Sequence, residues 1–321
     1  MDAQILIFND LHLADKPPRS RKPGYMEEGL DMLSEIIDIA RERGAEAIVG
    51  SGDLWHVKIP WRTSYYLWSQ ALSILQGSPC PVFLVPGNHD MGPLGIKSLS
   101  DQPLGALHQA KAAVILQTST YSPIHRVKTP SGFHIVPREF NVYRDADPEW
   151  YALRHDEQST EGTVILVAHG SVTPPGVYRE YPVVQVHEIA LTGIDVLAAG
   201  HIHEDLGTKE YSGVTYTNVG SLGRTARTEA NLTRTVKIVS VHRDPLTVEE
   251  IPLKSALPAE EIFWDREAEA PVDDTIAEFV ERLKENAQFE QMDLPAAVRT
   301  LGLGPEVEAS VLHYLGESGV E

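Results

Sequence analysis

Short apolar runs alternate with longer amphipathic stretches in the first part of the chain. The runs at 5–8, 47–49 and 82–85 are rich in Ile, Val, Leu and Phe, as buried strands are. Between them, residues 26–43 and 63–76 carry apolar side chains at helical spacing. Strand–helix–strand units of this kind pair their strands in parallel, so the pattern predicts an α/β fold.

Further apolar runs continue the strand pattern along the chain. Strands are expected at 113–116, 133–136, 164–168, 196–200, 215–219 and 236–241. The last of these alternates apolar and polar residues, which favours an antiparallel strand. The stretch 137–162 is rich in Pro, Asp and Glu and is expected to form loops with one short helix.

The composition changes after Leu253. Residues 256–321 carry 16 acidic and 4 basic side chains, and their spacing predicts helices at 275–286 and 307–315. We therefore expect a large domain, residues 1–255, followed by a small acidic and mainly helical segment, residues 256–321. This segment is expected to act as a reduced cap, as a partner-docking helix pair or as a cover for the core.

Composition narrows the class of protein. No apolar run approaches the roughly 20 residues of a membrane helix, and the first residues lead into a strand without signal-peptide features. Cys80 is the only cysteine, which excludes an internal disulfide and suits a reducing cytoplasm. The net charge of −19 argues against non-specific adhesion to nucleic acid. It does not exclude a nucleic-acid enzyme in which local cationic side chains or metal ions bind the phosphates.

Ligand-type side chains follow five of the predicted strands. The carboxyl ends of parallel strands are where open α/β sheets place their sites. Any one of these residues has a structural explanation as a polar turn, but six of the 13 histidines fall in these places. The residues are Asp10, His12, Asp53, His56, Asn88, His89, Asp90, His169, His201 and His203.

The chemistry of this set indicates metal ions. Imidazole, carboxylate and amide ligands without thiolate suit Mn²⁺, Fe²⁺ or Zn²⁺. Seven candidate ligands exceed what one tetrahedral ion needs, so two ions bridged by a shared carboxylate are expected.

The motifs are similar to those of the calcineurin-like metallophosphoesterase superfamily. The similarity covers roughly residues 4–245 and rests on Asp10-x-His12, Gly52-Asp53, Gly87-Asn88-His89-Asp90, His169 and Gly200-His201-x-His203. It implies a β-sandwich flanked by helices, in an αββα-like arrangement. It also implies two divalent ions, Mn²⁺ in the first instance, with Fe²⁺, Zn²⁺ or Mg²⁺ as alternatives.

The resemblance also implies residue roles. Asp10, His12 and His203 would serve mainly one ion, and Asn88, His169 and His201 the other, with Asp53 bridging. Whether His201 and His203 exchange places stays open. His89 would be the general acid. Asp90 would orient His89, or be a simple turn carboxylate.

Two details resemble the SbcD-type double-strand-break repair exonucleases. The motif Gly-Asp-Leu-Trp-His at 52–56 ends in a histidine that helps to position the substrate in that group, with plain packing as the alternative for His56. The cationic loop after His12 suits backbone phosphates, unless it is only a solvated loop, and the turn at 220–221 resembles one in that group. The predicted substrate-binding residues are Lys16, Arg19, Arg21, Lys22, Ser221 and Arg224.

This branch implies a two-metal-dependent DNA exonuclease or endonuclease that uses a metal-bridging hydroxide, with His89 as the acid. The alternative is a small-molecule phosphodiesterase or phosphatase with the same centre, while a non-catalytic scaffold is disfavoured by the complete ligand set. The resemblance also implies a DNA substrate, an SbcC-like coiled-coil ATPase partner and a homodimer. The aromatic stretch 65–68 would supply the dimer surface, unless it packs in the core.

Overall fold

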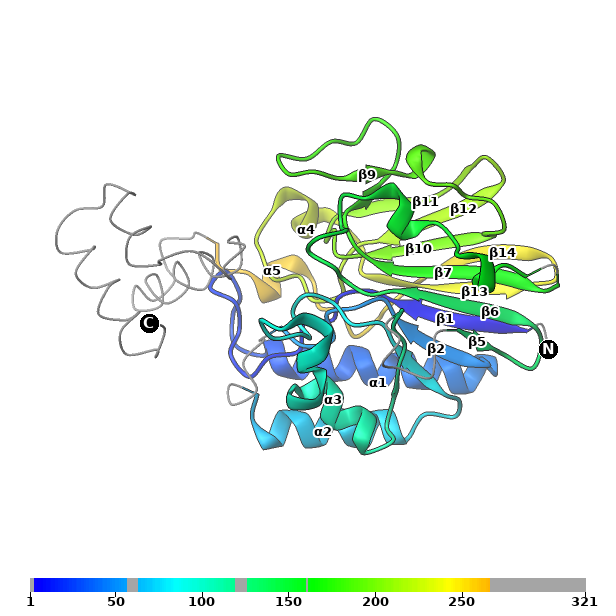
Figure 1. Ribbon diagram of the computed structural model, residues 1–321. Coiled ribbons are helices and arrows are strands. Elements are labelled where there is room, and N and C mark those ends of the chain that lie inside the picture. Colours follow the sequence, from blue (N-terminus) through cyan, green and yellow to red (C-terminus); the bar gives the residue numbers. More distant parts are fainter. Residues whose placement is uncertain (1–2, 57–62, 119–125, 160, 266–321) are drawn as a thin grey trace. The chain divides into compact units, whose positions relative to one another are not determined.

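The computed structural model describes residues 3–56, 63–118, 126–159 and 161–265 (Figure 1). The chain divides into two units, residues 1–263 and 264–321, and the description below concerns the first. Residues 256–263 pack within this first unit, whereas the sequence assigns them to the C-terminal segment. The helices predicted at 275–286 and 307–315 lie outside the described residues.

The first sheet has six strands in the order β14–β13–β1–β2–β3–β4. Strands β1 to β4 run parallel to one another, while β13 is antiparallel to β1 and β14 to β13. The bounds are β1 (Gln4–Phe8), β2 (Ala47–Gly50), β3 (Val82–Leu84), β4 (Val114–Ile115), β13 (Lys237–Arg243) and β14 (Leu246–Pro252).

The second sheet also has six strands, in the order β11–β12–β10–β7–β6–β5. Its inner strands are parallel, and the edge strands β11 and β5 pair antiparallel with their neighbours. The bounds are β5 (Val127–Lys128), β6 (Phe133–Arg138), β7 (Thr163–His169), β10 (Val196–Gly200), β11 (Asp205–Tyr211) and β12 (Val214–Val219). Strands β8 (Val172–Thr173) and β9 (Val184–Gln185) form a separate parallel pair.

The two sheets pack face to face because their strands are apolar on both sides. Ile5 and Ile7 of β1 join a core with Ile165 and Val167 of the second sheet. Leu6 and Phe8, on the other side of β1, pack with the helices. This double burial explains the continuous apolar runs in the sequence.

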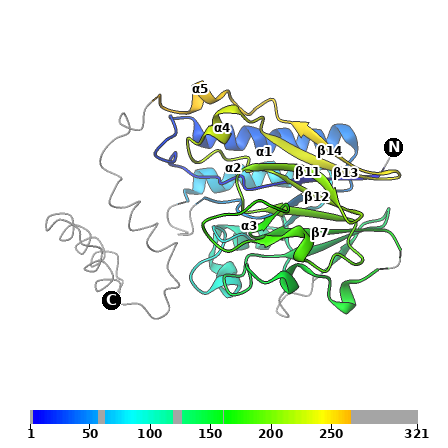
Figure 2. The same ribbon diagram turned by 90° about the horizontal axis from the view of Figure 1, so that it is seen from above.

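Helices cover the outer face of the first sheet (Figure 1). Figure 2 shows α1 beside β13 and β14 of that sheet. The other sheet is covered by loops, by β8 and β9 and by short helices. The helices are α1 (Tyr25–Arg43), α2 (Tyr65–Gln76), α3 (Pro103–Gln109), α4 (Glu229–Thr233) and α5 (Ala259–Ile262), with 3₁₀ turns η2 (Gly95–Asp101), η3 (Pro148–Tyr151), η4 (His155–Glu157) and η5 (Val186–Glu188).

The predicted fold class, an α/β sandwich of two sheets flanked by helices, is confirmed. The strands that the sequence pattern did not predict are β5, β8, β9, β11 and β14. Three of them are sheet edges, where exposed polar residues hide the apolar alternation. In the described ranges, none of the helices has the length and apolar character that a membrane crossing needs.

Candidate metal centre

The carboxyl ends of β1, β2, β3, β7 and β10, with the loops that follow them, carry the candidate ligands and the predicted catalytic residues to one end of the sandwich. Asp10, His12, Asp53 and His201 all have positive φ, at 45°, 52°, 49° and 80°. This left-handed region is rarely used by residues with a side chain. The described residues include six such non-glycine positions, so four of the six belong to this site. Backbone strain is therefore concentrated where the candidate ligands converge.

Glycines let these loops approach one another closely. A Cβ atom on Gly52, where φ is 116°, would lie 2.0 Å from Nδ1 of His169. A Cβ on Gly87 would lie 2.1 Å from Oδ1 of Asp53. Both distances are far inside van der Waals contact, so only glycine fits at these two positions.

Two groups of side chains face each other across Asp53. In the first group, the ligand atoms of Asp10, His12, Asp53 and His203 all lie within 4.8 Å of one another. Nε2 of His12 is 2.9 Å from Nε2 of His203 and 3.8 Å from Oδ2 of Asp53.

The second group contains Asp53, His169 and His201, whose ligand atoms also lie within 4.8 Å of one another. Oδ1 of Asn88 lies between the two rings, 3.1 Å from Nε2 of His169 and 3.1 Å from Nδ1 of His201. Oδ2 of Asp53 is 3.3 Å from Nε2 of His169. Two adjacent ligands of an octahedral ion with bonds of about 2.1 Å are about 3 Å apart, so both groups fit a divalent ion.

Hydrogen bonds on the far side hold these ligand atoms in place. Nδ1 of His169 donates to the Ser51 carbonyl oxygen at 2.8 Å, so Nε2, which faces Asn88 and Asp53, is the candidate ligand atom. The Ser51 hydroxyl in turn donates to the Asn9 side chain at 2.6 Å. Ser51 and Asn9 are buried supports that the sequence reasoning missed, although each is a polar residue next to a motif.

The pKa values of the carboxyl groups show what this burial costs. The pKa of Asp10 is raised to about 7, mainly by burial and in smaller part by the charge of the neighbouring Asp53. Burial also raises the pKa of Asp53, but His169 and His89 lower it, so the net value lies well below the usual range. A cation between the two carboxylates would stabilise both in their ionised form.

The imidazoles divide into two kinds. Burial lowers the pKa of His203 to about 3 and of His201 to about 4, and it holds that of His12 well below its usual value. These rings are therefore neutral, as metal ligands must be. Burial also opposes charge on His169, but Asp53 and Asp10 raise its pKa to about 10, which marks its position as one that favours positive charge.

His89 and His56 stand beside the first group. Their rings are stacked, with centroids 5.4 Å apart, and Nδ1 of His89 is 2.7 Å from the His56 carbonyl oxygen. Nitrogen atoms of His12, His56 and His89 also lie within 4.8 Å of one another. The carbonyl of His56 thus orients the ring of the predicted acid.

Asp90 is buried, and its carboxylate accepts from the backbone N–H groups of Trp55 at 3.1 Å and Gly87 at 3.0 Å. It therefore fixes the turn that carries Asp53 to the turn that carries Asn88. These bonds act on the backbone of both turns, so an effect of Asp90 on His89 would act through the backbone of the turn and not through the ring.

The structure divides the predicted substrate-binding residues. Lys16 and Arg19 are exposed, and Lys22 is half-buried and donates to the Glu260 carbonyl oxygen. Arg21 and Arg224 are buried and both pair with Glu28, so both have a structural role in this fold. The sequence could not reveal this, because the partner belongs to α1.

Ser221, another of the predicted substrate-binding residues, is also buried and contributes to the structure of its turn. The backbone N–H of Ser221 donates to the His203 carbonyl oxygen at 3.1 Å. The guanidinium group of Arg234 donates to the Ser221 carbonyl oxygen. This turn therefore fixes the backbone that carries His203. Arg234 was missed because it lies in a stretch without a motif.

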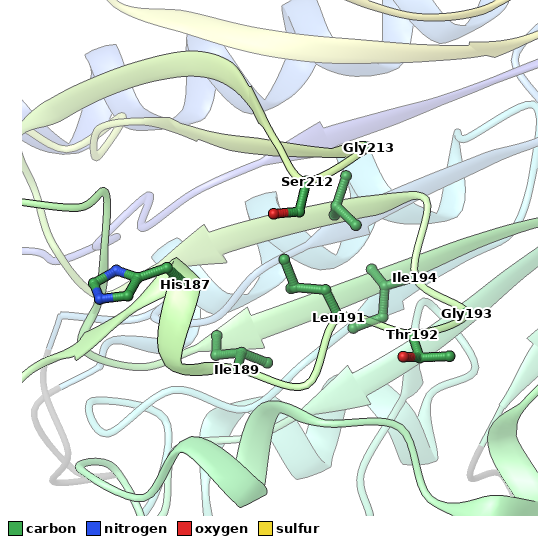
Figure 3. A pocket seen from close by; sticks show the side chains of 9 residues that line it. His187, Ile189, Leu191, Thr192, Gly193, Ile194, Ser212 and Gly213 are labelled. Atoms are coloured by element: carbon green, nitrogen blue, oxygen red, sulfur yellow. The ribbon is translucent and has the colours of Figure 1, made fainter.

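A pocket of about 400 Å³ lies at the other end of the second sheet (Figure 3). It is lined by His187, Leu191, Ile194 and Ser212 among others, next to the amino ends of β10 and β12. None of the predicted site residues lines it.

The two-sheet sandwich and the set of candidate metal ligands are together typical of a metallophosphoesterase. The chain matches the family described as calcineurin-like phosphoesterase over residues 3–205. It belongs to this family, and the predicted family and the predicted enzyme class, a metal-dependent phosphoesterase, are confirmed.

Similar proteins include a DNA repair protein and two proteins of known structure. The chain is 27% identical to the DNA double-strand break repair protein Mre11 of Halobacterium salinarum, covering 98% of this chain and 75% of that protein. A dimetal phosphatase from Danio rerio has a similar fold, with a TM-score of 0.50 and 13% identity over 78% of this chain and 96% of that one. A protein from Thermus thermophilus gives a TM-score of 0.48 and 12% identity, over 78% of this chain and 99% of its own.

Proposed function

We propose that this protein is a two-metal-dependent nuclease that hydrolyses phosphodiester bonds in DNA. The observation that carries the proposal is the pair of ligand groups that share Asp53. The similarity to an Mre11 repair protein along nearly the whole chain supports DNA as the substrate.

In this proposal Asp10, His12 and His203 hold one ion, Asn88, His169 and His201 hold the other, and Asp53 bridges them. The grouping of ligand atoms supports this division and leaves His201 with the second ion. Two divalent ions bound there, with Mn²⁺ as our first choice, would supply a hydroxide nucleophile at neutral pH and neutralise charge at the phosphate.

His89 is proposed as the general acid. Since Nδ1 is held by the His56 carbonyl oxygen, Nε2 is the atom that would give a proton to the leaving oxygen. Its ring lies 4.9 Å from that of His12, between centroids, which places it next to the first ion's group without being a member of it. Lys16 and Arg19, exposed on the loop after His12, would contact backbone phosphates.

The same resemblance supports a coiled-coil ATPase partner, a homodimer and a cap or docking role for the C-terminal segment. Tyr65 and Tyr66 are exposed on α2, whereas Leu67 is buried. The aromatic stretch therefore has both a surface part and a core part, and only the surface part would serve a dimer.

A second candidate is a phosphodiesterase for small substrates. The burial of Arg21, Ser221 and Arg224 favours it, because it leaves fewer exposed cations beside the site than a polynucleotide would use.

The test is digestion of end-labelled single-stranded and double-stranded DNA with Mn²⁺, with and without EDTA, beside bis-p-nitrophenyl phosphate. We expect DNA cleavage that EDTA abolishes. His89→Ala should lower the rate by about 10²–10⁴-fold while both ions stay bound. Brisk turnover of the small phosphodiester without DNA cleavage would replace the nuclease by the second candidate.

A further inference from the structure

One residue, His56, contacts both the first ligand group and the predicted acid. Its carbonyl oxygen lies 2.7 Å from Nδ1 of His89. Its ring Nδ1 lies 3.3 Å from Nδ1 of His12, and its own N–H donates to the Leu13 carbonyl oxygen at 2.9 Å. The backbone and the ring of His56 therefore act on two different residues of the site.

The position of one hydrogen follows from the ligand role of His12. A neutral imidazole carries its hydrogen on one ring nitrogen only. Nε2 of His12 faces His203 and Asp53, so it must be unprotonated to bind an ion there. The hydrogen of His12 is then on Nδ1, where it points at Nδ1 of His56. Nδ1 of His56 must accept it, so the hydrogen of His56 is on Nε2.

The second ligand group uses the same device with a different acceptor. Nδ1 of His169 donates to the carbonyl oxygen of Ser51, which can only accept. For His12, the corresponding acceptor is the side chain of His56. A ring nitrogen can be replaced by mutation where a backbone carbonyl cannot, so this contact is open to a direct test.

We propose that His56 is a positioning residue that fixes the tautomer of His12 through its ring and orients His89 through its carbonyl. The inference rests on the proposed metal centre. It differs from the expected role of His56, which is contact with the substrate, because it predicts an effect on metal affinity when no substrate is present. Loss of an outer partner of a metal-ligating histidine typically weakens metal binding by about 10–100-fold.

Two amide variants separate the ring nitrogens. In His56→Asn the amide oxygen can take the place of Nδ1, whereas in His56→Gln the amide reaches the place of Nε2. Both variants keep the carbonyl that orients His89, and His56→Ala removes the ring alone.

The experiment is calorimetric titration of Mn²⁺ into the metal-free full-length protein and each variant. We expect His56→Asn to bind both ions within a few-fold of the wild-type affinity. His56→Gln and His56→Ala should bind one of the two ions about 10–100-fold more weakly and the other unchanged. Wild-type affinity for both ions in His56→Ala would overturn the inference. Weaker metal binding in His56→Asn together with wild-type binding in His56→Gln would overturn it as well.

A spectroscopic measurement on the wild type keeps the test independent of how the variants fold. Long-range ¹⁵N–¹H correlation of the Zn²⁺-loaded protein should show His12 protonated at Nδ1 and His56 at Nε2. Protonation of His56 at Nδ1 would contradict the inference. Wild-type protein that binds no Mn²⁺ would instead contradict the proposed function.

Discussion

Two buried polar clusters of the molecule differ in how their charges are paired. In one, Glu28 lies between the guanidinium groups of Arg21 and Arg224, so each charged side chain has a partner of opposite sign. In the other, Asp10 and Asp53 lie among three imidazoles that burial keeps neutral, and only the position of His169 favours a positive charge among these four rings. Because a buried charge is costly unless it is paired, the first cluster is complete and the second is built for a cation.

The largest expected effect is the loss of both ions in Asp53→Asn. Asp53 belongs to both ligand groups, so the variant should bind neither ion tightly, and phosphodiester turnover should fall below detection. The metal-free variant should be less stable than the metal-free wild type, because it loses the negative charge that pairs with His169. Metal analysis and thermal denaturation measure the two effects. Asp38→Asn, which removes an exposed carboxylate paired with Arg41, is the matched control. If Asp53→Asn still binds two ions, Asp53 is not a ligand shared by both.

Glu28→Gln should lower stability and leave metal binding intact. Removing one partner of a buried ion pair costs about 3–5 kcal/mol, so the free energy of unfolding should fall by that amount. The folded fraction should still bind Mn²⁺ with wild-type affinity. Urea unfolding measures the change, and Glu27→Gln, on the same turn of α1, should stay within about 0.5 kcal/mol of the wild type. Equal stability of the two variants would show that the pairs with Arg21 and Arg224 contribute little.

Metal removal should change stability only through the cluster that contains Asp10 and Asp53. Mn²⁺ at 100 times its Kd should stabilise the protein by about 2.7 kcal/mol for each site, and EDTA should reverse this. Glu28→Gln should gain the same increment, whereas Asp53→Asn should gain none. Thermal denaturation with and without EDTA gives the comparison, and an increment in Asp53→Asn would place the ions elsewhere.

The smallest effect is expected on the surface of the loop after His12. Arg19→Ala should lower the slope of log affinity for DNA against log salt by about one, as for one lost phosphate contact. Fluorescence anisotropy over a salt series measures it. Lys111→Ala, before the amino end of β4, should leave the slope unchanged. An equal slope for Arg19→Ala and the wild type would remove this loop from the DNA contact.

The sequence was sufficient for the central strands and for the candidate ligands. Buried parallel strands leave continuous apolar runs, and each ligand closely follows such a run, as Asp10 follows β1 and His201 follows β10. Because parallel strands end at the same edge, local motifs implied a common site before any contact was known.

The rest depends on contacts that no local pattern encodes. Arg21 and Arg19 look alike in the sequence, yet only Arg21 is buried, because Glu28 and the Arg224 carbonyl oxygen accept from it. Arg234 supports the site by donating to the Ser221 carbonyl oxygen, and Ser51 does so by accepting from the ring of His169. Such roles arise only from the three-dimensional arrangement.

The most direct test of the two-ion centre is anomalous diffraction from crystals soaked in Mn²⁺. The account predicts two peaks about 3.5–4 Å apart, both within bonding distance of the Asp53 carboxylate. The first peak should also contact Asp10, His12 and His203, and the second Asn88, His169 and His201. A single peak, or peaks that Asp53 does not reach, would contradict the account.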